Sequence, residues 1–158
     1  MLDVPLLRRV LRGEPSPTAA AIEGARSGLA VAVEEGIKGL YWKDFEVLVD
    51  LLFRQSGWQR LTTVGETMKF TDIDLLDPLN GYRYQVQVKS TADASDLTKY
   101  VAGFDPTHFR KLYFVVHTPM GDLSGVPADP AVELVPPSRL ARMVVDLGLV
   151  PWLLTRLK

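Results

Sequence analysis

The chain of 158 residues contains no cysteine and only two histidines, His108 and His117. The absence of cysteine excludes disulfide bonds and zinc sites built from thiolates, and two histidines cannot form a three-histidine metal site. His117 ends an apolar segment and is expected to be structural. No apolar run approaches the roughly 20 residues of a membrane-spanning helix. Residues 1–13 interrupt their apolar stretch with arginines, unlike a signal peptide. We therefore expect a soluble cytoplasmic protein that does not bind membranes.

The sequence also lacks a strong charge of either sign. Its formal net charge is −1, so any contact with nucleic acid must come from a local basic patch. It contains no glycine-rich phosphate loop followed by lysine, no G-x-S-x-G elbow and no dinucleotide-binding fingerprint. Hydrophobic residues make up 47% of the chain and charged residues 23%, which is the ordinary balance of one globular domain with a substantial core.

The N-terminal part of the chain is predicted to be a helical extension. Residues 4–11 and 18–35 favour two helices separated by a linker that contains prolines. Thr18 is the expected N-cap of the second helix, and two glycines would end it. We therefore expect an extension over residues 1–39 and the main domain over residues 40–158.

The rest of the chain alternates helix-like and strand-like segments. Residues 40–55 predict the clearest helix, because their apolar side chains recur at three- and four-residue spacing on one face. Strands are expected at residues 58–64, 70–77, 82–90, 112–117 and 131–135, and further helices at residues 93–103 and 139–147. This order of elements is typical of a layered α/β fold.

Two neighbouring strand segments carry polar side chains at alternate positions. Asp72 and Asp74 share one face of the earlier segment, and Gln87 and Lys89 share one face of the later one. If the two segments form a hairpin, carboxylates, an amide and an ammonium meet on one side of it. Such a group of side chains can hold a divalent cation and stabilise a phosphate under attack.

The register of this hairpin depends on its turn. Asn80-Gly81 is a strong signal for a two-residue turn. With that turn, each aspartate faces a polar residue of the second strand: Asp74 opposite Gln87, and Asp72 opposite Lys89. Pro78 cannot donate a ladder hydrogen bond, so the loop can be wider. A four-residue loop shifts the pairing by two and keeps the polar groups together, whereas an odd-length loop separates them unless a bulge intervenes.

Over residues 40–119 the chain resembles the PD-(D/E)xK nuclease superfamily, and within it the Mrr-type branch of restriction endonucleases, where glutamine replaces the second acidic residue. Four stretches carry the resemblance: Trp42–Val49, Gly57-Trp58, Ile73–Leu76 and Gln87–Ser90. The resemblance implies a restriction-endonuclease-like fold with a central mixed sheet and helices on both sides. It also implies metal-dependent hydrolysis of phosphodiester bonds in DNA, for restriction or DNA processing.

The resemblance also implies roles for individual residues. Asp74 matches the acidic residue that ligates magnesium, Gln87 the variable acidic position, and Lys89 the lysine beside the attacking water. Glu46 matches the acidic residue of the first core helix, and the carbonyl of Val88 would be a further ligand. Mg²⁺ is the implied cofactor, with Mn²⁺ as a substitute. Because Gln87 is neutral, metal binding should be weaker or rely more on Glu46 than at an acidic site.

Other residues are candidates for contacts with the substrate. Asp72 is a second candidate for the metal or the substrate, and Ser90 can contact a phosphate or cap the following helix. Arg83 and Lys69 belong to a set of basic residues that can line a phosphate-binding groove. The other members of this set are Arg60, Lys99, Arg110 and Lys111. A chain this small would need a second copy or a partner subunit to cut both strands of DNA.

The chain departs from the family pattern before Asp74, where the proline and the glycine-rich approach are absent. Simpler interpretations exist for the same residues. Asp72 and Lys89 can form an exposed cross-strand ion pair, and Glu46 can pair with Lys43 on the helix surface. The main alternative function is therefore an inactive nuclease fold that binds nucleic acid or a protein, and a third is a purely structural subunit.

Overall fold

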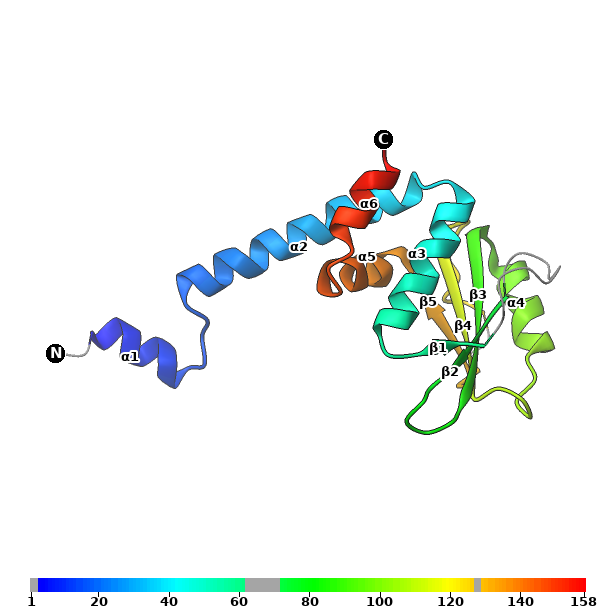
Figure 1. The fold of residues 1–158 in the computed structure, drawn as a ribbon. Helices are drawn as coiled ribbons and strands as arrows, with labels where there is room; N and C mark the ends of the chain where they lie inside the picture. The colour runs from blue at the N-terminus through cyan, green and yellow to red at the C-terminus, as the bar shows by residue number, and fades with distance from the viewer. Residues whose placement is uncertain (1–2, 62–71, 127–128) are drawn as a thin grey trace.

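The computed structural model describes residues 3–61, 72–126 and 129–158, and for Asp72 the backbone alone (Figure 1). Its helices are α1 (Val4–Leu11), α2 (Pro17–Lys38), α3 (Trp42–Gln55), α4 (Ala94–Gly103), α5 (Pro137–Asp146) and α6 (Val150–Arg156). Its strands are β1 (Gln59–Arg60), β2 (Asp72–Leu76), β3 (Arg83–Ala92), β4 (Lys111–Pro119) and β5 (Val132–Val135). They form one mixed sheet in the order β1-β2-β3-β4-β5, antiparallel up to β3 and parallel from there on.

Helices cover both faces of the sheet, so the fold has three layers (Figure 1). On one face, here called the α3 face, α2, α3, α5 and α6 contribute to a large apolar cluster around Phe45, Leu48 and Val86. On the other face, called the α4 face, α4 covers a smaller cluster that includes Leu97 and Phe114. The prediction of a layered α/β fold is confirmed. None of the helices in the described part of the chain has the length and apolar character needed to cross a bilayer.

The beginning of α2 differs from the prediction. Ser16, and not Thr18, is the N-cap, because its hydroxyl accepts a hydrogen bond from the backbone N–H of Ala19 at 3.1 Å. Pro17 then occupies the first helical position, where the missing N–H costs nothing.

The end of α2 also lies beyond the predicted one. The helix passes through Gly36 and ends at Lys38. A side chain at Gly36 would place its Cβ 2.9 Å from Leu157, so glycine lets the C-terminal end of the chain pack closely against α2. The last turns of α2 bury Val33 and Ile37 in the core of the main domain.

The predicted two-residue turn between β2 and β3 is wrong, and the four-residue alternative describes the hairpin. Asp77 and Tyr82 close a loop over residues 78–81, with the backbone N–H of Asp77 donating to the carbonyl of Tyr82 at 3.0 Å. The carboxylate of Asp77 accepts hydrogen bonds from the N–H of Leu79 at 2.9 Å and from the side chain of Asn80 at 2.7 Å. These bonds stabilise the wider loop around Pro78.

The register is consequently shifted by two residues from the one first expected. Asp72 pairs with Gln87, and Asp74 pairs with Gln85. Lys89 therefore does not face Asp72 directly. Of the expected strands at residues 58–64 and 70–77, the described residues include β1 and β2, and residues 62–71 lie outside the described part of the chain.

α4 connects β3 to the parallel strand β4. Asp93 caps this helix, since its carboxylate accepts the N–H of Asp96 and the carboxylate of Asp96 accepts the N–H of Asp93. Ser90, considered above as a cap, lies inside β3 instead, because the strand continues to Ala92. The tight start of α4 fixes the helix against the end of β3.

Candidate functional site

Polar side chains of β2 and β3 lie on the α4 face of the sheet. Val86 of β3 and Ile73 of β2 belong to the apolar cluster on the α3 face. Because side chains alternate along a strand, Gln87, Lys89 and Asp74 point to the opposite face. We call this set, together with Gln85 between them, the polar row.

Gln87 lies at the centre of the polar row and is completely buried. Its neighbours across the sheet are Asp72 on β2 and Phe114 on β4. Neither its Oε1 nor its Nε2 has a hydrogen-bond partner among the described residues. A buried polar group without a partner costs about 1–3 kcal/mol. No described residue offsets this cost for Gln87.

Lys89 lies two residues beyond Gln87 and is half-buried. Its Nζ is 5.5 Å from the ring centroid of Tyr100 on α4, and Tyr100 also packs against Phe114 with 5.5 Å between ring centroids. The ammonium is therefore positioned by a cation–π contact. The sequence analysis did not identify Tyr100, although its three-residue spacing from Leu97 marks it as part of the inner face of α4.

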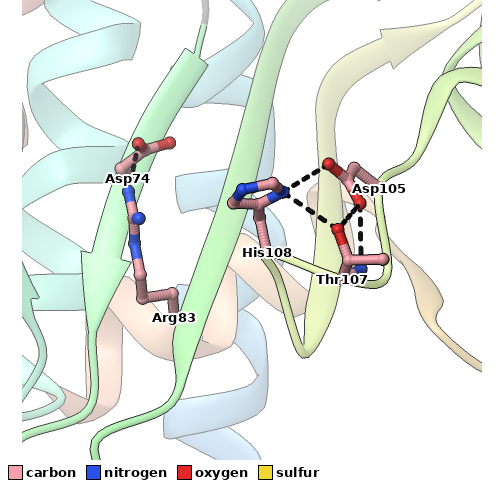
Figure 2. Close-up of polar contacts among 5 residues, drawn as sticks. All are labelled: Asp74, Arg83, Asp105, Thr107 and His108. Carbon is pink, nitrogen blue, oxygen red and sulfur yellow. Dashed lines mark hydrogen bonds and ion pairs between the residues drawn. The ribbon is translucent and has the colours of Figure 1, made fainter.

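Asp74 lies at the more open end of the polar row. Nη2 of Arg83 is 3.1 Å from Oδ2 of Asp74, so the two side chains form an ion pair across the hairpin (Figure 2). Since Asp74 pairs with Gln85, it stands diagonal to Gln87. The carboxylate position directly across from Gln87 is Asp72, whose side chain lies outside the described part.

A pocket of about 330 Å³ lies between the first turns of α3 and the second half of β3. Its lining residues are Trp42, Lys43, Phe45, Glu46, Val88, Lys89 and Ser90. Glu46 therefore shares a pocket with Lys89, although α3 covers the face opposite to Gln87. Burial raises the pKa of Glu46, and the charges of Arg60 and Lys43 oppose this effect. The Nζ of Lys43 lies 5.3 Å from the centroid of the Trp42 ring.

The predicted site residues thus form two groups. Asp74 and Gln87 belong to the polar row on the α4 face, whereas Glu46, Val88 and Ser90 line the pocket. Lys89 belongs to both, because it stands in the polar row and also lines the pocket. Lys69, a predicted substrate contact, lies outside the described residues.

His117 is buried on the α3 face near this pocket. Its ring meets Phe45 edge-on, with 4.5 Å between ring centroids, and its Nδ1 lies 2.7 Å from Oγ1 of Thr118. Burial lowers the pKa of His117. These contacts support the structural role expected from the sequence.

A separate polar cluster lies in the exposed loop before β4 (Figure 2). Oγ1 of Thr107 donates to Oδ1 of Asp105 at 2.6 Å, and Nδ1 of His108 lies 2.6 Å from the other carboxylate oxygen and 3.0 Å from Oγ1 of Thr107. The hydrogen bonds from Thr107, with that of His108, lower the pKa of Asp105 to about 2. Both partners meet the same ring nitrogen, so Thr107 does not stand where the nucleophile of a catalytic triad would, at the other nitrogen of His108.

Two of the predicted basic residues gather in a second hollow, of about 460 Å³, at the beginning of β3 and β4. Its lining residues are Tyr84, Arg110, Lys111, Tyr113, Pro130 and Ala131. Lys111 pairs with Glu133 at 2.8 Å, and the guanidinium of Arg110 lies 5.2 Å from the ring centroid of Tyr82. This hollow combines positive charge with aromatic surface, a pairing that suits nucleic acid.

Within the described residues, no three histidine, aspartate or glutamate side chains lie close enough together to hold a metal ion. The predicted metal site uses a different donor set, with Asp74, the carboxamide of Gln87, the carbonyl of Val88 and Glu46, and with Asp72 as a second acidic candidate. The Oε1 of Gln87 fits this set, because it is a neutral oxygen that no described residue engages in a hydrogen bond. Oxygen donors of this kind suit Mg²⁺ and Mn²⁺.

A scan of the chain against protein-family models finds no match, and a search of the curated proteins finds none either. What the site can do is therefore inferred from its own side chains and from the sequence motif described above.

Proposed function

We propose that the protein has a restriction-endonuclease-like fold and is a metal-dependent nuclease that hydrolyses phosphodiester bonds in DNA. The mixed sheet between two helical layers is the architecture that the sequence resemblance implies. The observation that carries the proposal is Gln87, a buried carboxamide that has no partner among the described residues, stands beside two aspartate positions on β2 and is followed by Lys89 on the same face. A fold that needed only stability would place an apolar side chain there.

Residues of the polar row, together with Asp72 and Val88, would have different roles in phosphate hydrolysis. Asp72, Asp74, Gln87 and the carbonyl of Val88 would hold the metal, which when bound neutralises phosphate charge and makes a bound water more acidic. Lys89 stabilises negative charge that develops on the phosphoryl oxygens or orients the attacking water. Its contact with Tyr100 keeps the ammonium at a fixed place before substrate arrives.

The observed register changes which aspartate matters most. Because Asp72 lies directly across from Gln87 and Asp74 is engaged by Arg83, Asp72 is the better candidate for the principal acidic ligand. We expect Asp72→Asn to reduce cleavage more than Asp74→Asn does. The opposite ranking would support the assignment that the sequence motif alone gives.

The decisive experiment is a cleavage assay on purified protein with Mg²⁺ or Mn²⁺ and double- and single-stranded DNA. Wild type should produce cleaved DNA, and Lys89→Met should reduce the rate by about 100-fold or more. Lys158→Met is the matched control, because Lys158 is an exposed lysine beyond α6. Equal rates for wild type and Lys89→Met would refute the nuclease assignment.

A second function, an inactive nuclease fold that binds nucleic acid, is favoured by one observation. Arg83 already neutralises Asp74, which is the state expected of a carboxylate that no longer holds a metal. In that case DNA binding would be insensitive to Mg²⁺, no product would form, and charge reversal at Arg110 and Lys111 would weaken binding. Magnesium-dependent cleavage would exclude this function.

A further inference from the structure

The N-terminal helices form an arm that leaves the body of the molecule (Figure 1). We define the arm as α1 together with residues 17–31 of α2. α1 buries none of its residues, and α2 buries only its last turns, at Val33 and Ile37. In Figure 1, α1 lies beyond the N-terminal end of α2 and not alongside it.

α1 is strongly two-sided. At 3.6 residues per turn, its large apolar side chains occupy one face, and its arginines occupy the other. The apolar members are Val4, Leu6, Leu7, Val10 and Leu11, all exposed, up to 80% at Leu11. The arginines are Arg8, Arg9 and the adjoining Arg12. A helix of 8 residues is marginal in water by itself, so this apolar face requires a cover.

α2 carries a second uncovered apolar surface on the same arm. Ile22, Leu29, Val33 and Ile37 are spaced by seven, four and four residues, so they lie along one side of the helix. Val33 and Ile37 are buried in the cluster that includes α5 and α6, whereas Ile22 is 64% and Leu29 41% exposed. An apolar seam therefore begins inside the molecule and continues into solvent.

The joint between the two helices keeps these surfaces apart. Gly13 has a φ of +65° and ends α1, with the N–H of Glu14 donating to the carbonyl of Arg9 at 3.0 Å. Ser16 and Pro17 then start α2 in a new direction. Two capped ends with glycine and proline between them specify a turn, which is not the signature of one interrupted helix.

We propose that the arm exchanges with the arm of a second copy of the chain. In this dimer α1 of each copy packs its apolar face on the Ile22–Leu29 seam of the other copy. In a dimer with one two-fold axis, both apolar surfaces of each copy are buried, as in an isologous interface. The arginines of α1 remain in water. The lengths are compatible, since α1 spans about 12 Å and fits within the roughly 22 Å of residues 17–31 of α2 at 1.5 Å per residue.

Binding to a lipid surface or to a nucleic acid would account for fewer of the exposed side chains of the arm. Either could engage the arginines of α1, but neither accounts for the seam on α2 as a continuation of an interface already used within the chain. Arg26, between the two exposed seam residues, is itself paired with Asp146 of α5 and with Glu23. The charged side chain beside the seam is therefore already paired, and the exposed apolar side chains of the seam are suited to packing against another apolar helix.

The first test measures the mass of the full chain in solution by light scattering or sedimentation. The expected mass is twice the 17.6 kDa of the monomer. The double variant Leu7→Glu and Leu11→Glu should halve that mass, and so should Ile22→Glu. The control, Arg8→Glu with Arg12→Glu, places two glutamates on the opposite face of α1, changes the net charge by more than the Leu7 and Leu11 variant does, and should still remain dimeric. A circular dichroism spectrum and an unfolding curve for each variant confirm that the main domain stays folded.

The second test uses the absence of cysteine from the chain. Leu7→Cys and Ile22→Cys proteins are prepared separately, mixed and oxidised, and they should yield a cross-linked heterodimer. Mixing Arg8→Cys with Ile22→Cys should yield far less. A monomeric wild type, a dimer unaffected by the Leu7 and Leu11 changes, or a monomer that binds vesicles containing anionic phosphatidylglycerol through α1 would overturn the proposal.

Discussion

Among the described residues, each face of the sheet buries one polar side chain, and the surroundings of the two differ. On the α3 face, the Nδ1 of His117 lies beside the Thr118 hydroxyl, and its ring packs against Phe45. On the α4 face, Gln87 is more deeply buried and finds no hydrogen-bond partner among the described residues. The histidine is thus paired at Nδ1 only, since its buried Nε2 has no hydrogen-bond partner among the described residues. The described residues offer the glutamine no partner at either polar atom, and we therefore infer that a requirement other than stability has acted on the α4 face.

The apolar clusters sharpen this contrast. The α3 face carries a continuous core built from four helices and the sheet. The cluster under α4 is smaller, and the polar row runs beside it. We conclude that the α3 face supplies most of the folding energy and allows the α4 face to keep side chains that cost stability.

The largest expected effect comes from truncating a buried side chain in the core on the α3 face. Leu48→Ala removes a fully buried side chain of the main cluster and should lower the free energy of unfolding by about 2–5 kcal/mol. Urea denaturation followed by circular dichroism measures this change. Val47→Ala, at an exposed position on the same helix, should change stability by less than about 0.5 kcal/mol. Similar losses for both variants would contradict the assignment of the core.

The opposite result is expected on the α4 face. Gln87→Leu replaces the orphaned carboxamide by an apolar side chain of similar size and should raise the free energy of unfolding by about 1–3 kcal/mol, while cleavage of DNA is lost. Gln85→Leu, at a half-buried position of the same row, is the control and should gain less. A clear loss of stability in Gln87→Leu would show that the carboxamide is hydrogen-bonded in solution.

A smaller effect is expected at the open end of the polar row. Arg83→Gln removes the ion pair with Asp74, and a pair this exposed contributes about 0.2–1 kcal/mol. Freed from the guanidinium, Asp74 should bind a cation better, so titration calorimetry should give a tighter dissociation constant for Mn²⁺. Unchanged or weaker binding of Mn²⁺ would place Asp74 outside the metal site.

The smallest effect concerns His117 and appears only in acid. Burial lowers the pKa of His117 below the 6.5 of an unfolded chain, so the unfolded state takes up a proton more readily than the folded state. Stability is therefore complete above about pH 6.5 and declines as the pH falls through the pKa of the folded state. Denaturation curves at several pH values should show this decline in wild type and in His108→Leu, but less of it in His117→Leu.

Strand alternation allowed the faces of the sheet to be predicted from sequence. The positions of Gln87 and Lys89 relative to Val86 follow from a two-residue period that any pairing register preserves. The same reasoning gave the helix α3, since its apolar spacing is unambiguous. These features depend on local patterns, which the sequence displays directly.

The register and the surroundings of the site could not be obtained in the same way. The choice between a two-residue and a four-residue loop depended on hydrogen bonds from Leu79 and Asn80 to one carboxylate, that of Asp77. The contact of Lys89 with Tyr100 depends on how a crossover helix settles on the sheet. The sharing of one pocket by Glu46 and Lys89 likewise results from three-dimensional packing.

The strand order has a consequence for how the chain assembles. Because the strands follow one another across the sheet in the order in which they occur in the sequence, each can be added to the free edge of its predecessor. No strand must be threaded between two that are already paired, and the β2–β3 hairpin, closed by a short loop, has the smallest entropic barrier to form first. Growth during synthesis on the ribosome can then proceed in one direction, from β1 towards β5.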